Sequence, residues 1–250
     1  MRSVADWQGP YKALRLVLLS DSHAMHRCLR VPDGDVLIHA GDFTMFNRRS
    51  SVLDFNSWLQ DLPHRHKIVV PGNHEFNFNR SKWRDLITGA ALLVNEGIEV
   101  GGIRIWGSPV TPADSGAFGG MTERDRRRIF SAIPEDTDVV ITHSPPFGIL
   151  DRESLEGEYQ GCKEIAEAIQ RVQPRLHVFG HIHGAYGVEW VGSTVFVNAA
   201  LASVGYELTK EAITVDFDTH ARAVVVPRPM APFPRRVGAR GGSHLRRTLS

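Results

Sequence analysis

The chain has 250 residues, 42% of them hydrophobic, which is enough for a sizeable core in one large folded unit. Lys and Arg number 29 and Asp and Glu number 28, so the formal net charge is only +1. This balance disfavours nucleic acid or an anionic membrane as the main partner. Cys28 and Cys162 form no Cys-x-x-Cys pair, which argues against a disulfide scaffold or a thiolate zinc site and favours a cytoplasmic location.

The first half of the chain predicts a β-α-β pattern after a flexible lead-in at residues 1–12. The apolar run 14–19 is too short to span a bilayer and is interrupted by Arg15, so it indicates a strand. A helix is predicted where apolar residues recur at helical spacing behind a serine that is expected to cap it. The predicted strands cover residues 16–19, 36–39 and 68–70, and the predicted helix covers residues 51–62.

The second half predicts a hairpin, two helices and several further strands. Gly101-Gly102 is a turn signal between the hairpin strands 98–100 and 103–106. Helices are predicted over 122–131 and 163–172, and strands over 139–142 and 176–179. The last β-rich runs, 194–198, 213–217 and 223–226, are expected to form a second sheet.

These elements predict an α/β fold with two packed mixed β-sheets flanked by helices, an α/β/β/α arrangement. The folded domain is expected to cover residues 13–226. From residue 227 the composition changes to Pro, Gly and Arg without an acidic residue, so residues 227–250 are predicted to form a basic, disordered tail. Its arginines could contact RNA or an acidic partner, although a solvated tail is the simpler interpretation.

Five short polar segments each follow a predicted apolar strand. Asp and His two residues apart can turn toward one cation, a carboxylate can bridge two cations, and an amide oxygen adds a neutral ligand. Each segment alone has an ordinary structural explanation as a turn or an interior histidine, but their combination indicates a metal site. The predicted ligands of two cations are Asp21, His23, Asp42, Asn73, His143, His181 and His183.

His74 stands beside Asn73 and is predicted to stay off the metal and protonate the leaving group as a general acid. Asp42 is predicted to bridge the cations. Such a pair would hold a hydroxide between two Lewis acids, ready for attack on phosphorus.

The order Asp-x-His, Gly-Asp, Gly-Asn-His-Glu, His, Gly-His-x-His resembles the calcineurin-like metallophosphoesterase superfamily. The segments 35–44, 107–109, 142–148 and 176–183 resemble its subgroup of metallophosphoesterase domain-containing proteins. The similarity covers roughly residues 14–217. It implies one metal at Asp21, His23, Asp42 and His183, and the other at Asp42, Asn73, His143 and His181.

The resemblance implies a dinuclear enzyme that hydrolyses phosphodiester bonds of small molecules, with cyclic nucleotides as one class of substrate. N and O donors suit Mn, Fe, Zn, Co or Ni, of which Mn is favoured. Protein phosphatases continue the second motif with Asp-Arg-Gly, whereas Asp42 here precedes Phe43-Thr44, which argues against phosphoprotein substrates. Alternatives are a phosphomonoesterase of the same mechanism and a nucleotide-binding or scaffold protein with weak activity. A zinc amidohydrolase would place His-x-His first rather than last.

Other polar residues are expected to have structural roles. His39 and His177 lie inside predicted strands and should form buried hydrogen bonds. His64, His66 and His220 are predicted at the surface. Arg48 and Arg49 could reach a substrate phosphate but are more simply explained as solvated. The loop 144–161 follows His143, and it either shapes the substrate pocket or only connects two elements.

Overall fold

Two six-stranded β-sheets form the centre of the protein in a computed structural model that describes residues 13–76, 78, 82–113 and 116–227. The predicted lead-in 1–12 and all but the first residue of the predicted tail 227–250 lie outside the described residues. The domain boundaries inferred from sequence therefore stay predictions.

The first sheet is mixed. Its central strands run parallel to one another, whereas the two strands from the end of the chain pair antiparallel beside β1. The order across this sheet is β12 (Ala223–Val225), β11 (Ile213–Asp218), β1 (Ala13–Leu19), β2 (Val36–His39), β3 (His66–Val69) and β4 (Ala91–Leu92).

The second sheet is mixed as well. Four neighbouring strands are parallel, and an antiparallel strand closes each edge. The order is β5 (Glu96–Val100), β6 (Ile103–Ser108), β7 (Val139–Thr142), β8 (Leu176–Phe179), β10 (Thr194–Asn198) and β9 (Gly187–Val191).

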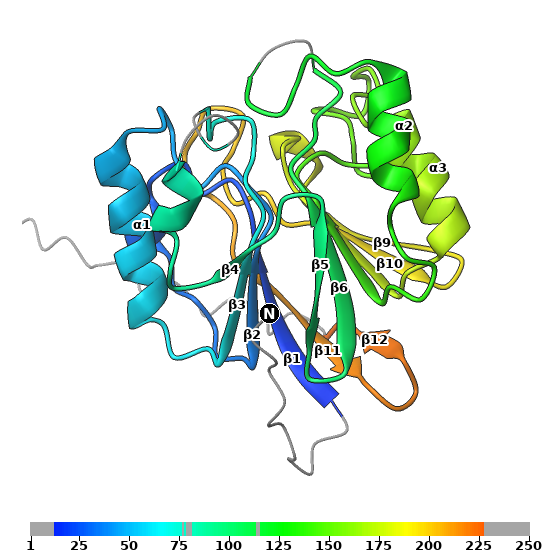
Figure 1. The fold of residues 1–250 in the computed structure, drawn as a ribbon, viewed down its shortest axis with the longest axis horizontal. Coiled ribbons are helices and arrows are strands. Elements are labelled where there is room, and N and C mark those ends of the chain that lie inside the picture. The colour runs from blue at the N-terminus through cyan, green and yellow to red at the C-terminus, as the bar shows by residue number, and fades with distance from the viewer. Residues whose placement is uncertain (1–12, 77, 79–81, 114–115, 228–250) are drawn as a thin grey trace, which may run out of the picture.

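Helices cover the outer faces of the sheets (Figure 1). Helix α1 (Arg49–Asp61) lies outside the first sheet, and α2 (Glu123–Ser131) with α3 (Lys163–Val172) lies outside the second. Short 3-10 turns occur at His26–Cys28, Lys82–Leu86 and His183–Ala185. The predicted α/β/β/α layering is confirmed.

Alternation along the strands builds separate cores on the two faces of each sheet. In β1, Leu16 and Leu18 point between the sheets, whereas Val17 and Leu19 face the α1 side. The core between the sheets draws on both of them, with Ile38 from β2 and Ile141 from β7. A third core joins the second sheet to α2 and α3. Because both faces of each sheet are covered, the strands place their functional residues at their ends.

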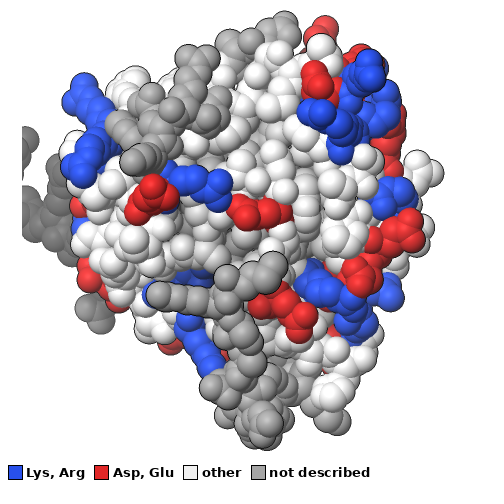
Figure 2. All heavy atoms as spheres, viewed as in Figure 1, with Lys and Arg blue, Asp and Glu red and all other residues white. Residues whose placement is uncertain are grey.

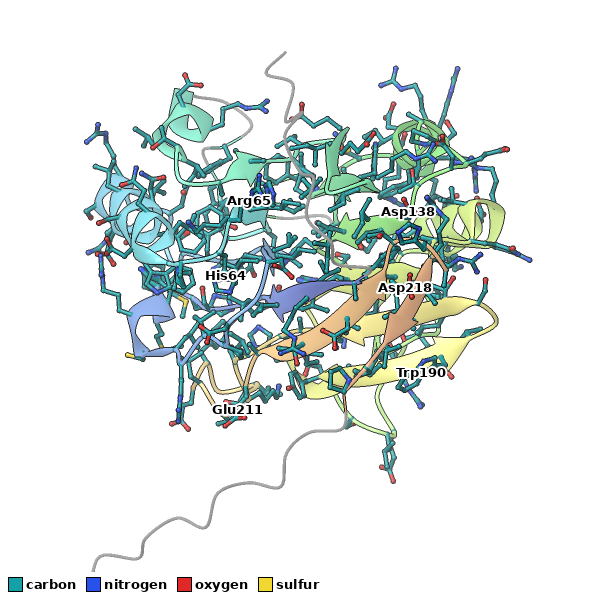
Figure 3. The ribbon with its side chains drawn as sticks, turned by 90° about the horizontal axis from the view of Figure 1, so that it is seen from below. His64, Arg65, Asp138, Trp190, Glu211 and Asp218 are labelled. Carbon is teal, nitrogen blue, oxygen red and sulfur yellow. The ribbon has the colours of Figure 1, made fainter. Side chains whose placement is uncertain are left out.

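Several sequence predictions differ from the structure in a physically understandable way. The runs 213–217 and 223–226 do not join the second sheet, because β11 pairs with β1 in the register Leu16 to Val215, and β12 pairs with β11. Figure 3 shows these orange strands beside the blue β1. Strand periodicity does not identify the sheet to which a strand belongs. The strand predicted at 68–70 begins two residues earlier and ends one residue earlier in the structure, because β3 covers His66–Val69.

Strands β4 and β9 were not predicted. Strand β4 has only two residues, and β9 is an edge strand with exposed apolar side chains, such as Trp190, which is labelled at the margin of the molecule in Figure 3. The serine cap of the first helix was also wrong. Arg48 is the N-cap residue and makes no side-chain cap bond, so both nearby serines lie in the first turn.

Candidate metal centre

The seven predicted ligands all follow strands, and they meet at one end of the two sheets. Asp21 and His23 follow β1, Asp42 follows β2, and Asn73 comes after β3. From the second sheet, His143 follows β7, and His181 and His183 follow β8. The sheets are joined at this end, because Ser20 pairs with Ala200 and accepts a 3.0 Å hydrogen bond from the backbone N–H of Leu201.

Ligand atoms of these residues form compact groups. Asp21, His23 and His183 make up one group, in which the ligand atoms lie within 4.8 Å of one another. Asp42, His143 and His181 form a second group by the same measure. His74 forms a third such group with His23 and Asp42, so its predicted role as a proton donor off the metal stays a prediction.

Backbone carbonyls set the orientation of three imidazoles. Nδ1 lies 2.9 Å from Ala40 O in His143, 2.9 Å from Ser203 O in His183 and 2.7 Å from Met45 O in His74. A carbonyl oxygen only accepts, so each Nδ1 carries the proton that it donates. Nε2 of each ring therefore points into the centre, where His143 and His183 would offer its lone pair to a metal once it is deprotonated. This is the arrangement that metal-binding histidines adopt in proteins.

Nitrogen and oxygen ligand atoms of different residues face one another inside the centre. The Nε2 atom of His143 is 2.8 Å from Asn73 Oδ1 and 3.4 Å from Asp42 Oδ2. The Nε2 atom of His183 is 3.3 Å from Asp21 Oδ1, a buried oxygen that has no hydrogen-bond partner among the described residues. A proton on Nε2 makes these contacts favourable when no metal is bound, whereas with neutral rings they are contacts between lone pairs that a bound cation would relieve. The donor set of imidazole, carboxylate and amide oxygen thus fits divalent transition metals.

The charges lead to the same conclusion. Burial lowers the pKa of His143, but the carboxylate of Asp42 outweighs it and raises this pKa to about 9. Burial raises the pKa of Asp42, but His143 reverses the effect and holds the value near 2. The pKa of Asp21 is also lowered, because His183 and the neighbouring imidazoles outweigh burial. The two carboxylates therefore attract positive charge, which the neighbouring imidazoles supply as protons when no cation is bound.

Four of the predicted ligands have strained backbone conformations. The φ angles of Asp21, His23, Asp42 and His181 are 54°, 43°, 53° and 70°, all in the left-handed region. Residues with side chains occupy this region at an energetic cost, and such residues cluster at functional sites. A further close approach occurs at Gly180, where an added Cβ would lie 2.0 Å from Asp21 Oδ2.

Glu75 has a role that the sequence did not reveal. It belongs to the Gly-Asn-His-Glu segment, in which the sequence predicts roles for Asn73 and His74 alone. Its buried carboxylate accepts backbone N–H bonds of 3.0 Å from Asp42, 3.0 Å from Thr44 and 2.6 Å from Gly72, and a 2.8 Å bond from the Thr44 hydroxyl. Glu75 therefore ties the loop after β2 to the loop after β3.

Most histidines outside the centre behave as expected. His39 is buried, with Nε2 3.0 Å from Ser22 Oγ, and His177 is buried, with Nε2 2.8 Å from Thr142 Oγ1. His220 is exposed and His66 is partly exposed. The surface prediction for His64 was wrong, because its side chain is buried and its Nε2 lies 3.0 Å from Pro32 O.

The loop 144–161 lies next to the His183 turn. Gly184 N–H donates a 2.7 Å hydrogen bond to Glu153 Oε2, and loop residues line a cavity of about 490 Å³ together with residues 184–186. Whether this loop shapes the substrate pocket or only connects two elements stays open. Arg48 and Arg49 are exposed at the start of α1, and their contact with substrate stays a prediction.

Comparison with known proteins gives the same picture. The family model described as calcineurin-like phosphoesterase matches residues 3–185. The chain belongs to the calcineurin-like phosphoesterase family. Metallophosphoesterase domain-containing protein 1 of Homo sapiens and that of Mus musculus are each 39% identical over 233 residues, covering 82% of this chain and 71% of theirs. One solved crystal structure matches with a TM-score of 0.63 at 13% identity, over 85% of this chain and 98% of its own, which shows a shared fold alone.

Membership of this family confirms the resemblance seen in the motifs and identifies the protein as a metal-dependent phosphoesterase in general terms. The clusters around Asp21 and Asp42 provide its candidate metal positions. Within the described ranges, none of the helices is both long and apolar enough to cross a bilayer.

Proposed function

We propose that this calcineurin-like phosphoesterase hydrolyses phosphodiester bonds of small molecules, with cyclic nucleotides among the substrates, at a dinuclear metal centre. The observation that carries the proposal is the set of inward-facing nitrogen and oxygen ligand atoms around Asp42. Asp21, His23, Asp42 and His183 would hold one cation, and Asp42, Asn73, His143 and His181 the other. When bound, these cations supply Lewis acidity and an activated water for attack on phosphorus.

The protein's own residues supply orientation and protons. His74 Nδ1 is fixed by Met45 O, so its Nε2 faces the centre, where it lies 3.9 Å from Asp42 Oδ2. A proton held on this Nε2 would pass to the leaving oxygen when the P–O bond breaks. The backbone N–H of His74 donates a 2.9 Å hydrogen bond to Asp42 Oδ1, which keeps the proton donor and the bridging carboxylate in register.

Charge favours diesters over monoesters. In the described structure, the ion-pair partners of Asp21 and Asp42 are histidines alone. A diester carries one negative charge, whereas a monoester carries nearly two at neutral pH and benefits from an additional fixed cation such as arginine. Phosphomonoester hydrolysis by the same residues is the alternative.

The expected partner is a small phosphoester rather than nucleic acid. Figure 2 shows basic and acidic side chains interspersed on the face that it views, without one large region of a single sign. Free thiols at the exposed Cys28 and the buried Cys162 support a reducing, cytoplasmic location. We favour Mn²⁺ among the metals that this donor set accepts.

A substrate panel combined with metal analysis tests the proposal. Purified protein loaded with Mn²⁺ would be assayed on 2′,3′- and 3′,5′-cyclic nucleotides, bis(4-nitrophenyl) phosphate and 4-nitrophenyl phosphate. We expect two metals per chain and higher kcat/KM on the diesters. Faster hydrolysis of the monoester would select the alternative, and turnover of none of them by the metal-loaded protein would contradict both.

A further inference from the structure

Tyr206 lies against three histidines of the candidate metal centre. Its ring centroid is 4.8 Å from that of His23, 5.2 Å from that of His183 and 6.1 Å from that of His74. Despite these contacts, 43% of Tyr206 remains exposed. One part of the ring therefore packs on the centre, and another part faces the solvent from which a substrate arrives.

The backbone of Tyr206 is in an unfavourable conformation for a large side chain. Its φ is 61°, in a tight turn where its N–H donates a 2.9 Å hydrogen bond to Ser203 O and Ser203 N–H donates a 2.8 Å bond to Glu207 O. Glycine adopts this conformation without strain, whereas tyrosine does not. Strain of this kind is typical of ligand-binding positions. We therefore attribute the presence of a tyrosine here to its side chain and not to the conformation of the turn.

The turn is fixed to the metal centre. Ser203 O accepts the hydrogen bond of His183 Nδ1 at 2.9 Å. The ammonium of Lys210 donates a 2.8 Å bond to Ala202 O and also contacts His183 O. Tyr206 therefore keeps a defined position relative to His183.

A second exposed aromatic ring adjoins the proposed proton donor. The ring centroid of Phe76 is 6.1 Å from that of His74, and 48% of Phe76 is exposed. His74 thus has exposed aromatic neighbours from two separate loops. Because a proton donor must face the leaving group, one substituent of the phosphoester has to lie beside these rings.

We propose that Tyr206 is a specificity-determining residue, whose ring packs against an aromatic substituent of the phosphoester substrate. This inference rests on the proposed function and narrows its substrates to esters that carry a flat ring, such as a nucleobase or an aryl group. Aromatic pairs gain from offset or edge-to-face packing beyond the burial of area alone. The ring of Tyr206 would contribute this gain, and its hydroxyl would not be required.

Binding of two stable phosphonates tests the proposal without hydrolysis. Phenylphosphonate and methylphosphonate share the phosphonate group and differ in the ring. Titration calorimetry on the Mn²⁺-loaded full chain would give a Kd ratio of methylphosphonate to phenylphosphonate. We expect the ratio to be roughly three- to tenfold in the wild type and in Tyr206→Phe, and close to one in Tyr206→Gly.

Controls separate this role from a structural one. Tyr206→Gly suits the left-handed backbone, and its metal content should equal that of the wild type. Trp190→Ala removes an exposed ring from the edge strand β9 and should leave the ratio unchanged. A Kd ratio in Tyr206→Gly equal to that of the wild type would overturn the proposal, even if both phosphonates bound more weakly. A ratio that changes as expected in a protein that cleaves no diester would contradict the proposed function alone.

Discussion

Glu75 supports the centre without being one of its predicted ligands. All four of its hydrogen bonds come from donors in the loops after β2 and β3. Burial and the charge of Asp42 raise its pKa to about 8. In Glu75→Gln, an amide NH₂ would face backbone N–H groups. We expect the free energy of unfolding to fall by about 2 to 3 kcal/mol, measured by urea denaturation, together with a lower metal content. Glu99→Gln, at an exposed strand position, should change neither, and an equally stable Glu75→Gln would contradict this role.

The proton donor can also be tested as a single residue. His74→Ala should retain two metals and lose about 10²- to 10⁴-fold in kcat on esters with poor leaving groups, because these groups depend most on protonation. Esters with good leaving groups, such as 4-nitrophenolate, should lose much less. Steady-state kinetics across a series of leaving groups measures the difference, with the exposed His220→Ala as control. Loss of a metal from His74→Ala would instead make it a ligand.

At the scale of elements, the approach of the two sheets depends on the end of β8. A Cβ at Gly180 would lie 2.0 Å from Asp21 Oδ2 and 2.1 Å from Ser20 Oγ, so Gly180→Ala has to push the end of β8 away from β1. We expect a loss of stability of about 1 to 3 kcal/mol and a reduced metal content. Gly205→Ala is a matched control, because its added carbon meets only Ser203 Oγ at 3.6 Å. If Gly180→Ala bound metal like the wild type, the two sheets would have more freedom than this packing implies.

Buried strands were predicted well from sequence because their apolar runs are bounded by turn residues. The predicted runs 36–39, 139–142, 176–179 and 194–198 coincide with β2, β7, β8 and β10. Pairing was less predictable, since β11 has the same alternation in either sheet and its place depends on contacts with β1 that are almost 200 residues away in the chain. The candidate centre could be proposed from sequence because its residues lie within four positions of the ends of predicted strands. Tyr206 was not, because an exposed aromatic in a turn has no distinctive sequence pattern.

Two buried neutral histidines link the stability of the whole molecule to pH. Thr142 Oγ1 donates to Ser144 O at 2.6 Å and therefore accepts from His177 Nε2, while burial lowers the pKa of His177 to about 3. Burial lowers the pKa of His39 to about 3 as well. In the unfolded chain these groups bind protons near pH 6.5. Their stabilising effect is thus present above pH 6.5 and is lost as the pH falls toward 3.

We expect His177 alone to contribute a loss of about 2 kcal/mol in the free energy of unfolding between pH 7 and pH 5. His177→Gln keeps a donor for Thr142 but does not titrate, so its loss over this interval should be smaller by that amount. Urea denaturation of both proteins at the two pH values measures the difference. Parallel decreases in the two proteins would show that His177 is not the source.

The central claim is that one buried carboxylate joins two metal positions supplied by two sheets. The most direct test is the hydrolysis of bis(4-nitrophenyl) phosphate with added Mn²⁺ by Asp42→Asn, with circular dichroism to verify that the fold is intact. An amide cannot supply the negative charge that bridges two cations. We predict that activity is abolished while the fold is retained. Wild-type rates of hydrolysis in Asp42→Asn would contradict the dinuclear centre.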